Sequence, residues 1–195
     1  MKTYELNGQL RPEFGKKAAK SIRKNAQVPC ILYGGEEVIT FSVDEKDVRN
    51  LIYTPEIFLV QLNIEGKIVK SIVKDMQFHP VKDNVLHMDF YQVSEDKPIV
   101  VEVPVRLNGL AEGVKAGGKL SQELRKLKVK ALYNVIPEVL NVDVTDLGLG
   151  KTMQVGTLDF PGLEIVSAKQ AIVCAVKLTR VARGLAAAAA KEDKK

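Results

Sequence analysis

Residues 99–107 place an apolar side chain at every second position, and this period of two constrains the fold most strongly. The members of the apolar face are Ile99, Val101, Val103, Val105 and Leu107. Successive side chains of a strand point to opposite faces, whereas a helix repeats every 3.6 residues. Further short apolar runs at 127–131, 139–144 and 171–178 are set off by glycines and prolines. Short strands with regular turn signals and almost no helical pattern predict an all-β domain over 98–180.

The first half of the chain combines strands with two short helices. Apolar runs predict strands at 3–10, 28–33, 38–43 and 57–64, and the glycine turn at 65–67 makes the last of these a hairpin with 68–74. Helical spacing of apolar residues predicts helices over 15–25 and from Asp44 to the residue before Pro55. The polar stretch 94–98 ends in a proline and marks a boundary. We therefore expect a mainly β protein with domains at 1–94 and 98–180.

Positive charge is concentrated at the amino terminus. Residues 1–25 hold seven Lys or Arg against two acidic residues, which already equals the net charge of +5 of the 195-residue chain. On a helix, Lys16 and Lys20 share one side with Arg23 and Lys24, while alanines and Ile22 occupy the other. A basic segment on an otherwise neutral body indicates an anionic partner, most commonly nucleic acid. We predict that this surface binds structured RNA.

Other residues exclude several classes of protein. Cys30 and Cys174 lie in apolar runs, so we expect buried free thiols, no disulfide and a reducing compartment. His79 and His87 are the two histidines, and they lack the further ligands that a metal site needs. The chain shows neither a signal-peptide apolar region nor a stretch of membrane-spanning length. We expect a soluble cytoplasmic protein with no cofactor, no metal and no membrane partner.

His87 and Asp89 alternate on a predicted strand and therefore point to the same face. As a binding pair, Asp89 would orient His87 toward a 2′-hydroxyl or a base edge. Two other interpretations stay open: a satisfied surface histidine, and the acid–base couple of a small hydrolase. No nucleophile with its base and no phosphate-binding glycine loop accompanies the pair, so we expect no enzyme and no small-molecule substrate.

Several short motifs resemble the bacterial large-subunit ribosomal protein L twenty-five family. In the first half they are Arg11, Gly15-Lys16, Ala18, Arg23, Val28-Pro29, Ile31, Tyr33-Gly34, Gln77, His79-Pro80, His87 and Asp89-Phe90. In the second half, motifs similar to the extra β domain of the long form, general stress protein Ctc, are Val103-Pro104-Val105, 113–118, Ile136-Pro137-Glu138 and Val142-Asp143-Val144. The likeness covers residues 3 to about 178. Lys17, Ala19 and Ser21 depart from the pattern of the family.

The resemblance implies an amino-terminal β-barrel that seats on the loop E region of 5S rRNA. It also implies a structural role in translation, in the central protuberance of the 50S subunit beside neighbouring ribosomal proteins. At the positions where the family contacts RNA, this sequence has Arg11, Lys16, Lys20, Arg23, Tyr33, Gln77, His87 and Asp89, and the resemblance implies the same role for them. With the other basic-helix lysines and the second histidine, the expected RNA-binding residues are Arg11, Lys16, Lys17, Lys20, Arg23, Lys24, Tyr33, Gln77, His79, His87 and Asp89.

An alternative of another class is a stress-induced adaptor whose carboxy-terminal β domain binds a protein partner and whose first domain binds RNA loosely. The tail at 181–195 is rich in alanine and lysine and has no second apolar face to bury. We expect it to be a frayed helix or disordered.

Overall fold

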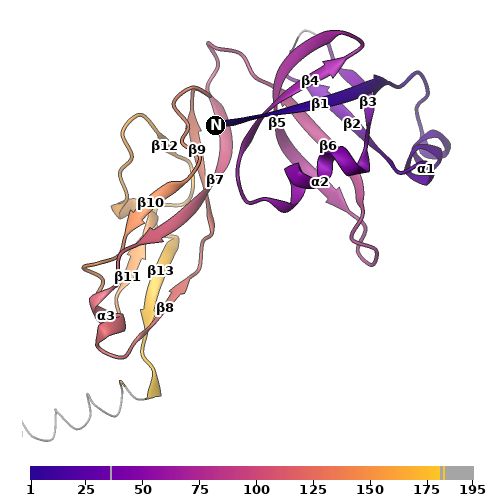
Figure 1. Cartoon of the computed structure of the whole chain (residues 1–195). Coiled ribbons are helices and arrows are strands. Elements are labelled where there is room, and N and C mark those ends of the chain that lie inside the picture. Colours follow the sequence, from indigo (N-terminus) through magenta and orange to yellow (C-terminus); the bar gives the residue numbers. More distant parts are fainter. Residues whose placement is uncertain (36, 181, 183–195) are drawn as a thin grey trace, which may run out of the picture. The chain divides into compact units, whose positions relative to one another are not determined.

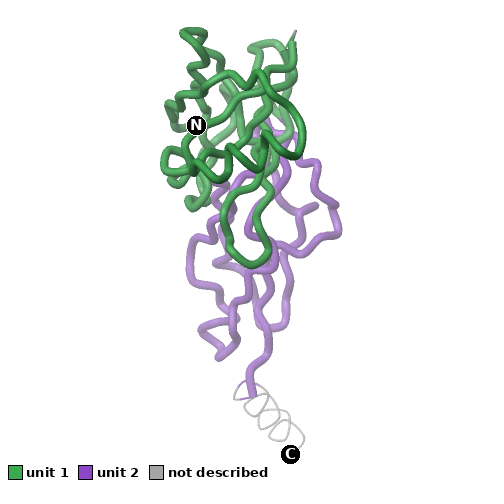
Figure 2. The backbone as a smooth tube through the Cα atoms, turned by 90° about the vertical axis from the view of Figure 1, so that its right-hand side faces the viewer, with its two compact units in different colours: residues 1–101, 131–138 green, residues 102–130, 139–195 purple. Residues whose placement is uncertain are grey.

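The structure of the chain is a computed structural model that describes residues 1–35, 37–180 and 182. The chain divides into two compact units (Figure 2). Unit 1 comprises residues 1–101 and 131–138, and unit 2 comprises 102–130 and the residues from 139 onward. Both units are built mainly from strands, which confirms the fold class predicted from the sequence.

Unit 1 is a closed barrel of six strands with two helices (Figure 1). Its elements are β1 (Lys2–Leu10), α1 (Lys16–Lys24), β2 (Gln27–Tyr33), β3 (Ile39–Asp44), α2 (Glu45–Tyr53), β4 (Phe58–Ile64), β5 (Lys67–Phe78) and β6 (Val85–Gln92). The strand order around the barrel is β1-β3-β2-β6-β5-β4. Two of its pairings are parallel, β1 with β4 and β2 with β6, and the others are antiparallel.

Alternation along each strand fills the barrel with apolar side chains. The inward residues include Val60 and Leu62 of β4 and Cys30 of β2, which are fully buried. The rings of Phe41 and Phe90 meet in the core with centroids 5.5 Å apart. Burial raises the pKa of the Cys30 thiol far above its usual range, so this thiol stays neutral and packs as a small hydrophobe. Both cysteines are free and buried, as predicted.

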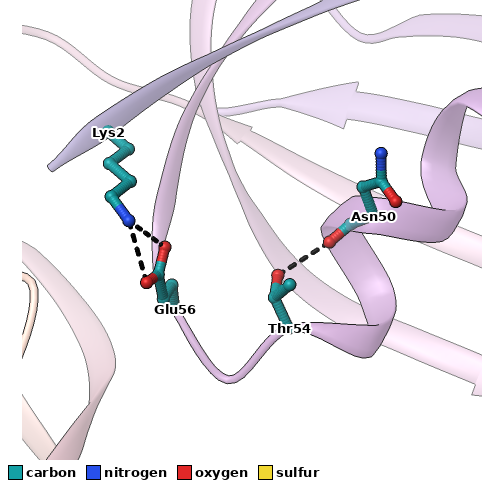
Figure 3. Close-up of polar contacts among 4 residues, drawn as sticks. All are labelled: Lys2, Asn50, Thr54 and Glu56. Atoms are coloured by element: carbon teal, nitrogen blue, oxygen red, sulfur yellow. Dashed lines mark hydrogen bonds and ion pairs between the residues drawn. The ribbon is translucent and has the colours of Figure 1, made fainter.

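Polar contacts hold α2 at its carboxyl end (Figure 3). The Thr54 hydroxyl donates a hydrogen bond to the carbonyl oxygen of Asn50 at 2.7 Å. The Lys2 ammonium donates to both carboxylate oxygens of Glu56, at 2.8 and 2.6 Å, and so ties the start of β1 to the loop after α2. Val48 and Leu51 of α2 are buried, so the opposite side of this helix is presented to solvent.

Unit 1 also includes a segment from much later in the chain, residues 131–138. The Tyr133 hydroxyl donates to a Glu95 carboxylate oxygen at 3.1 Å. The Lys70 ammonium lies 5.7 Å from the centroid of the Tyr133 ring, a cation–π distance. Unit 1 therefore extends beyond residue 94, and experiments on it are best made with the full chain.

Unit 2 contains a four-stranded sheet of order β10-β7-β9-β12 and a three-stranded sheet of order β11-β13-β8. Its elements are β7 (Ile99–Asn108), whose first residues belong to unit 1, α3 (Glu112–Lys115), β8 (Lys119–Gln122), β9 (Lys126–Ala131), β10 (Leu140–Asp143), β11 (Thr152–Gln154), the 3-10 turn η1 (Val155–Thr157), β12 (Glu164–Ile165) and β13 (Ile172–Lys177). The four strands β7, β9, β10 and β13 were predicted. The sequence pattern missed β8, β11, β12 and α3, which span two to four residues and display little or no period; β10 is equally short, but its alternation of Leu140 and Val142 continues at Val144. The predicted tail at 181–195 lies outside the described residues except for Ala182, which is buried.

Candidate nucleic-acid interface

The helix α1 presents lysines to solvent on a short rigid rod. Lys16, Lys17, Lys20 and Lys24 are exposed, and none of the nine residues of α1 is fully buried. Ala18, Ala19 and Ile22 are half-buried, which confirms the predicted orientation of the apolar side. Gly15 starts the helix at φ +98°, a left-handed conformation that favours glycine.

Arg23 differs from the lysines of α1 because its side chain is half-buried. Its Nε donates a hydrogen bond to the carbonyl oxygen of Leu86, at 3.0 Å. This bond joins α1 to the start of β6, one residue before His87. The predicted row of cations is therefore divided: the lysines are free, whereas part of the Arg23 guanidinium is used to fix the helix against the barrel.

Strand register brings four other predicted residues onto one outward surface: Tyr33, Gln77, His87 and Asp89. Gln77 of β5 lies opposite His87 of β6, and Asp89 of β6 lies opposite Ile31 of β2. Tyr33 lies at the far end of β2, two residues beyond Ile31. Because Cys30, Leu32, Met88 and Phe90 point into the barrel, the residues that alternate with them point outward.

Tyr33 packs against Tyr91, a residue that the sequence reasoning missed. Their ring centroids are 5.7 Å apart with the rings edge to face. Tyr91 continues the alternation of His87 and Asp89, and this period of two was the signal that would have identified it. Burial raises the pKa of Tyr33, and the nearby Asp89 and Asp75 carboxylates raise it further. The Tyr33 hydroxyl therefore stays protonated at physiological pH and can donate a hydrogen bond.

Gly34 allows this pair of rings to form. Its φ is +96°, and a Cβ built there would lie 2.6 Å from a ring carbon of Tyr91. The glycine turn after β2 thus lets the backbone approach the aromatic ring closely.

His87 and Asp89 form the pair expected from their spacing, with His87 Nδ1 2.7 Å from Asp89 Oδ1. The two side chains are 27% and 30% exposed, so the pair is accessible to a ligand. Arg11 follows β1, and its backbone N–H donates to the Thr40 carbonyl oxygen at 3.1 Å. The Nε of Arg11 is buried and has no hydrogen-bond partner in the described part of the chain.

His79 has hydrogen-bond partners of its own in the fold. It lies in the turn between β5 and β6, where its Nδ1 accepts hydrogen bonds from the backbone N–H groups of Val81 and Lys82, each at 3.2 Å. Its backbone N–H donates to the Asn84 carbonyl oxygen at 2.9 Å. These contacts give His79 a role in shaping the turn.

We call the exposed lysines of α1, together with Arg11 and the outward residues Tyr33, Gln77, His87, Asp89 and Tyr91, the basic face. Among the described residues, none of the Lys or Arg side chains of this face forms an ion pair. Lysines elsewhere do: Lys128, Lys130 and Lys177 of unit 2 each pair with a glutamate. Unneutralised cations beside aromatic and hydrogen-bonding groups can bind phosphates and groove edges together.

Two other kinds of site are absent from the described residues. Over 1–35, 37–180 and 182, no three His, Cys, Asp or Glu side chains gather in a way that could hold a metal ion. The helices of the same residues include none with the length and apolar character needed to cross a membrane.

Comparison with known proteins gives matches over both halves of the chain. A family model described as the Ribosomal L25p family matches residues 6–90, and one described as the C-terminal domain of ribosomal protein TL5 matches residues 98–180. A protein of Bacteroides thetaiotaomicron named large ribosomal subunit protein bL25 is 62% identical over 98% of this chain and 100% of its own length. Proteins of the same name from Porphyromonas gingivalis and Azobacteroides pseudotrichonymphae are 63% and 54% identical, covering 95% and 94% of this chain and 98% and 97% of their own lengths.

Proposed function

The chain belongs to the ribosomal L25p family, and from this premise we propose that it binds 5S rRNA through the basic face of unit 1. Members of the family are structural, non-enzymatic proteins of the ribosome, so the chain is a ribosome-associated cytoplasmic component of translation. The proposal adds the RNA species, the loop E region as its site, and the central protuberance of the 50S subunit as its location.

The observation that carries the proposal is the absence of neutralising carboxylates beside the cations of α1, within the described residues. A solvated surface helix commonly alternates the signs of its charges, and three lysines of unit 2, Lys128, Lys130 and Lys177, each lie beside a glutamate. Four exposed lysines on nine residues repel one another in the free protein. An array of phosphates relieves this repulsion and releases the counterions condensed on the RNA.

The other side chains of the basic face suit the minor groove of A-form RNA. This groove is wide and shallow and displays 2′-hydroxyls, which both donate and accept hydrogen bonds. The Tyr33 hydroxyl and the Gln77 amide supply donors, and Asp89 supplies acceptors. The buried Nε of Arg11, unpartnered within the described chain, would gain an acceptor from the RNA. In this proposal the lysines supply the affinity for RNA, and the strand residues fix the position of the protein along the groove.

The proposal is tested with the full chain in a gel-shift titration against 5S rRNA, with tRNA as competitor. Lys16→Gln with Lys20→Gln should weaken binding. The matched pair Lys119→Gln with Lys151→Gln should not; these are exposed lysines of unit 2 that form no ion pair among the described residues. Full affinity in the first double variant would refute the proposed interface. Preference for tRNA over 5S rRNA would refute the proposed RNA species and favour the adaptor.

A further inference from the structure

A groove of about 370 Å³ lies in unit 1 between α2 and the turn that joins β5 to β6. Figure 1 shows this turn beside α2. Lys46, Arg49, Ile52 and Tyr53 of α2 line one side, and Lys82 and Asn84 of the turn line the other. The volume is at the lower end of the range for small-molecule pockets, enough for one nucleotide.

Asn84, one of the residues that line this groove, has an unused hydrogen-bond acceptor in its side chain. Its side-chain Oδ1 is buried and accepts no hydrogen bond from the described residues. Buried polar atoms are nearly always partnered, and an unpartnered one carries a desolvation cost that a suitable ligand removes. The partner that Oδ1 lacks is an N–H or O–H donor.

Among the other lining residues, one aromatic ring, one aliphatic side chain and three cations suit a base and its phosphate, and Glu45 and Asp83 add two carboxylates to the same lining. Tyr53 is 65% exposed and offers an aromatic ring, while Ile52 is half-buried beside it. Lys46, Arg49 and Lys82 are not buried and form no ion pair among the described residues. Aromatic rings stack on bases without regard to sequence, and unpaired cations bind phosphate.

The backbone around the groove is held in an unusual conformation. Ala26 and Asp83 both line it, with φ of +57° and +55°. They are two of the three described non-glycine residues in the left-handed region, a conformation that side-chain-bearing residues adopt at a cost and that is enriched at functional sites. Ala26 follows the C-terminal end of α1, so the groove continues from the end of the basic helix.

Building on the proposed RNA-binding function, we infer that this groove holds one unpaired nucleotide of the RNA, whose base carries an exocyclic amine. The amine donates to Asn84 Oδ1, the base lies against Tyr53 and Ile52, and the phosphate lies among Lys46, Arg49 and Lys82. Cytosine, adenine and guanine carry such an amine, and uracil does not. Uracil presents a carbonyl oxygen at the position where cytosine presents its amine, and this oxygen would face Asn84 Oδ1.

The experiment compares cytidine and uridine monophosphates, which differ in the base at that position. Each is titrated into the full chain while amide signals are followed by NMR. Cytidine monophosphate should bind about threefold to tenfold more tightly, the ratio expected for one hydrogen bond, and should shift the signals of Tyr53 and Asn84. Equal affinities in the unmodified protein would overturn the inference.

Two variants test whether Asn84 causes the preference for cytidine monophosphate over uridine monophosphate. Asn84→Ala should bind both nucleotides equally, whereas Asn84→Asp, which keeps an acceptor at the same place, should retain the preference for cytidine. Asn141→Ala, an exposed asparagine of unit 2, is the matched control and should behave like the unmodified protein. Because Oδ1 of Asn84 has no partner in the described fold and is costly to bury, Asn84→Ala should not unfold at a lower temperature than the parent. A preference that persists in Asn84→Ala would also overturn the inference.

Binding of 5S rRNA separates this inference from the function on which it rests. Asn84→Ala should lower the affinity for 5S rRNA about threefold to tenfold at constant salt dependence, because it removes no charge. Unchanged affinity in Asn84→Ala, with weaker binding in Lys16→Gln with Lys20→Gln, would refute the groove and leave the function standing. An absence of 5S rRNA binding by the unmodified chain would refute the function itself.

Discussion

Replacing Gly34 with alanine perturbs the aromatic pair of the basic face in a way that the structure makes quantitative. Gly34 has φ +96°, and an added Cβ would lie 2.6, 2.9 and 3.0 Å from three carbons of the Tyr91 ring. Real Cβ contacts are longer than this, so the ring must move. Tyr33 packs edge to face on Tyr91 at 5.7 Å, and it loses its neighbour when the ring is displaced.

Two contributions add to the expected cost. A side-chain-bearing residue at positive φ costs about 1–2 kcal/mol, and overpacking of a fitted site costs about 1–3 kcal/mol. Gly34→Ala should therefore lower the free energy of unfolding by about 2–5 kcal/mol. Gly66 is the matched control: its φ is +87°, and nothing lies within 4 Å of the position of its Cβ. Gly66→Ala should cost only the backbone contribution, about 1–2 kcal/mol.

Urea denaturation of the full chain measures both variants, and a double-mutant cycle isolates the steric contribution. Tyr91→Ala removes the ring that the new Cβ would meet, so Gly34→Ala should cost about 1–3 kcal/mol less in that background. Equal costs for Gly34→Ala and Gly66→Ala would refute the reasoning. So would strict additivity of Gly34→Ala and Tyr91→Ala.

Three further outcomes follow from single residues. Ala26→Gly should stabilise unit 1 by about 0.5–1 kcal/mol, because glycine adopts a positive φ without strain and its greater loss of backbone entropy on folding offsets only part of that gain. A lower stability on thermal unfolding would contradict this. Arg23→Met removes the hydrogen bond to the Leu86 carbonyl and should lower the free energy of unfolding by about 1–2 kcal/mol. The same variant should weaken 5S rRNA binding by about 1–3 kcal/mol. Weaker binding with unchanged stability would mean that this hydrogen bond does not hold α1. Hydrogen bonds from the Thr145 hydroxyl and backbone N–H lower the pKa of Asp143 in the folded protein. The ionised carboxylate therefore stabilises unit 2 at pH values above the pKa of an unfolded aspartate, about 4. This stabilisation is lost as the pH falls through the lower pKa of the folded state. Asp143→Asn should therefore narrow the difference in stability between pH 7 and pH 3, and an unchanged difference would count against the assignment.

The strands and both helices of unit 1 could be predicted because their residues repeat with a clear local period. Phe58, Val60, Leu62 and Ile64 alternate and face the core together, as expected. The parallel pairing of β1 with β4 that closes the barrel has no local period, and only the family resemblance implied a barrel. The addition of residues 131–138 to unit 1 also depends on contacts between distant parts of the chain, such as that of Tyr133 with Glu95.

The candidate site was predictable to the same extent. Exposed lysines of α1 and the pairing of His87 with Asp89 follow from helical and strand spacing. The hydrogen bond from Arg23 to Leu86 spans 63 residues of sequence, and spacing within a helix cannot reveal it. The unpartnered oxygen of Asn84 is likewise a property of the folded groove, since an asparagine in a polar turn is common in any sequence.

The salt dependence of 5S rRNA binding tests the central claim most directly. If about five phosphates are neutralised by the basic face, a plot of log affinity against log salt for the full chain should have a slope of about −3 to −5. Lys16→Gln with Lys20→Gln should reduce the magnitude of that slope by about 2, one for each phosphate that is no longer neutralised. Lys119→Gln with Lys151→Gln should leave it unchanged. A slope near zero, or one that responds to the unit 2 lysines and not to those of α1, would contradict the account.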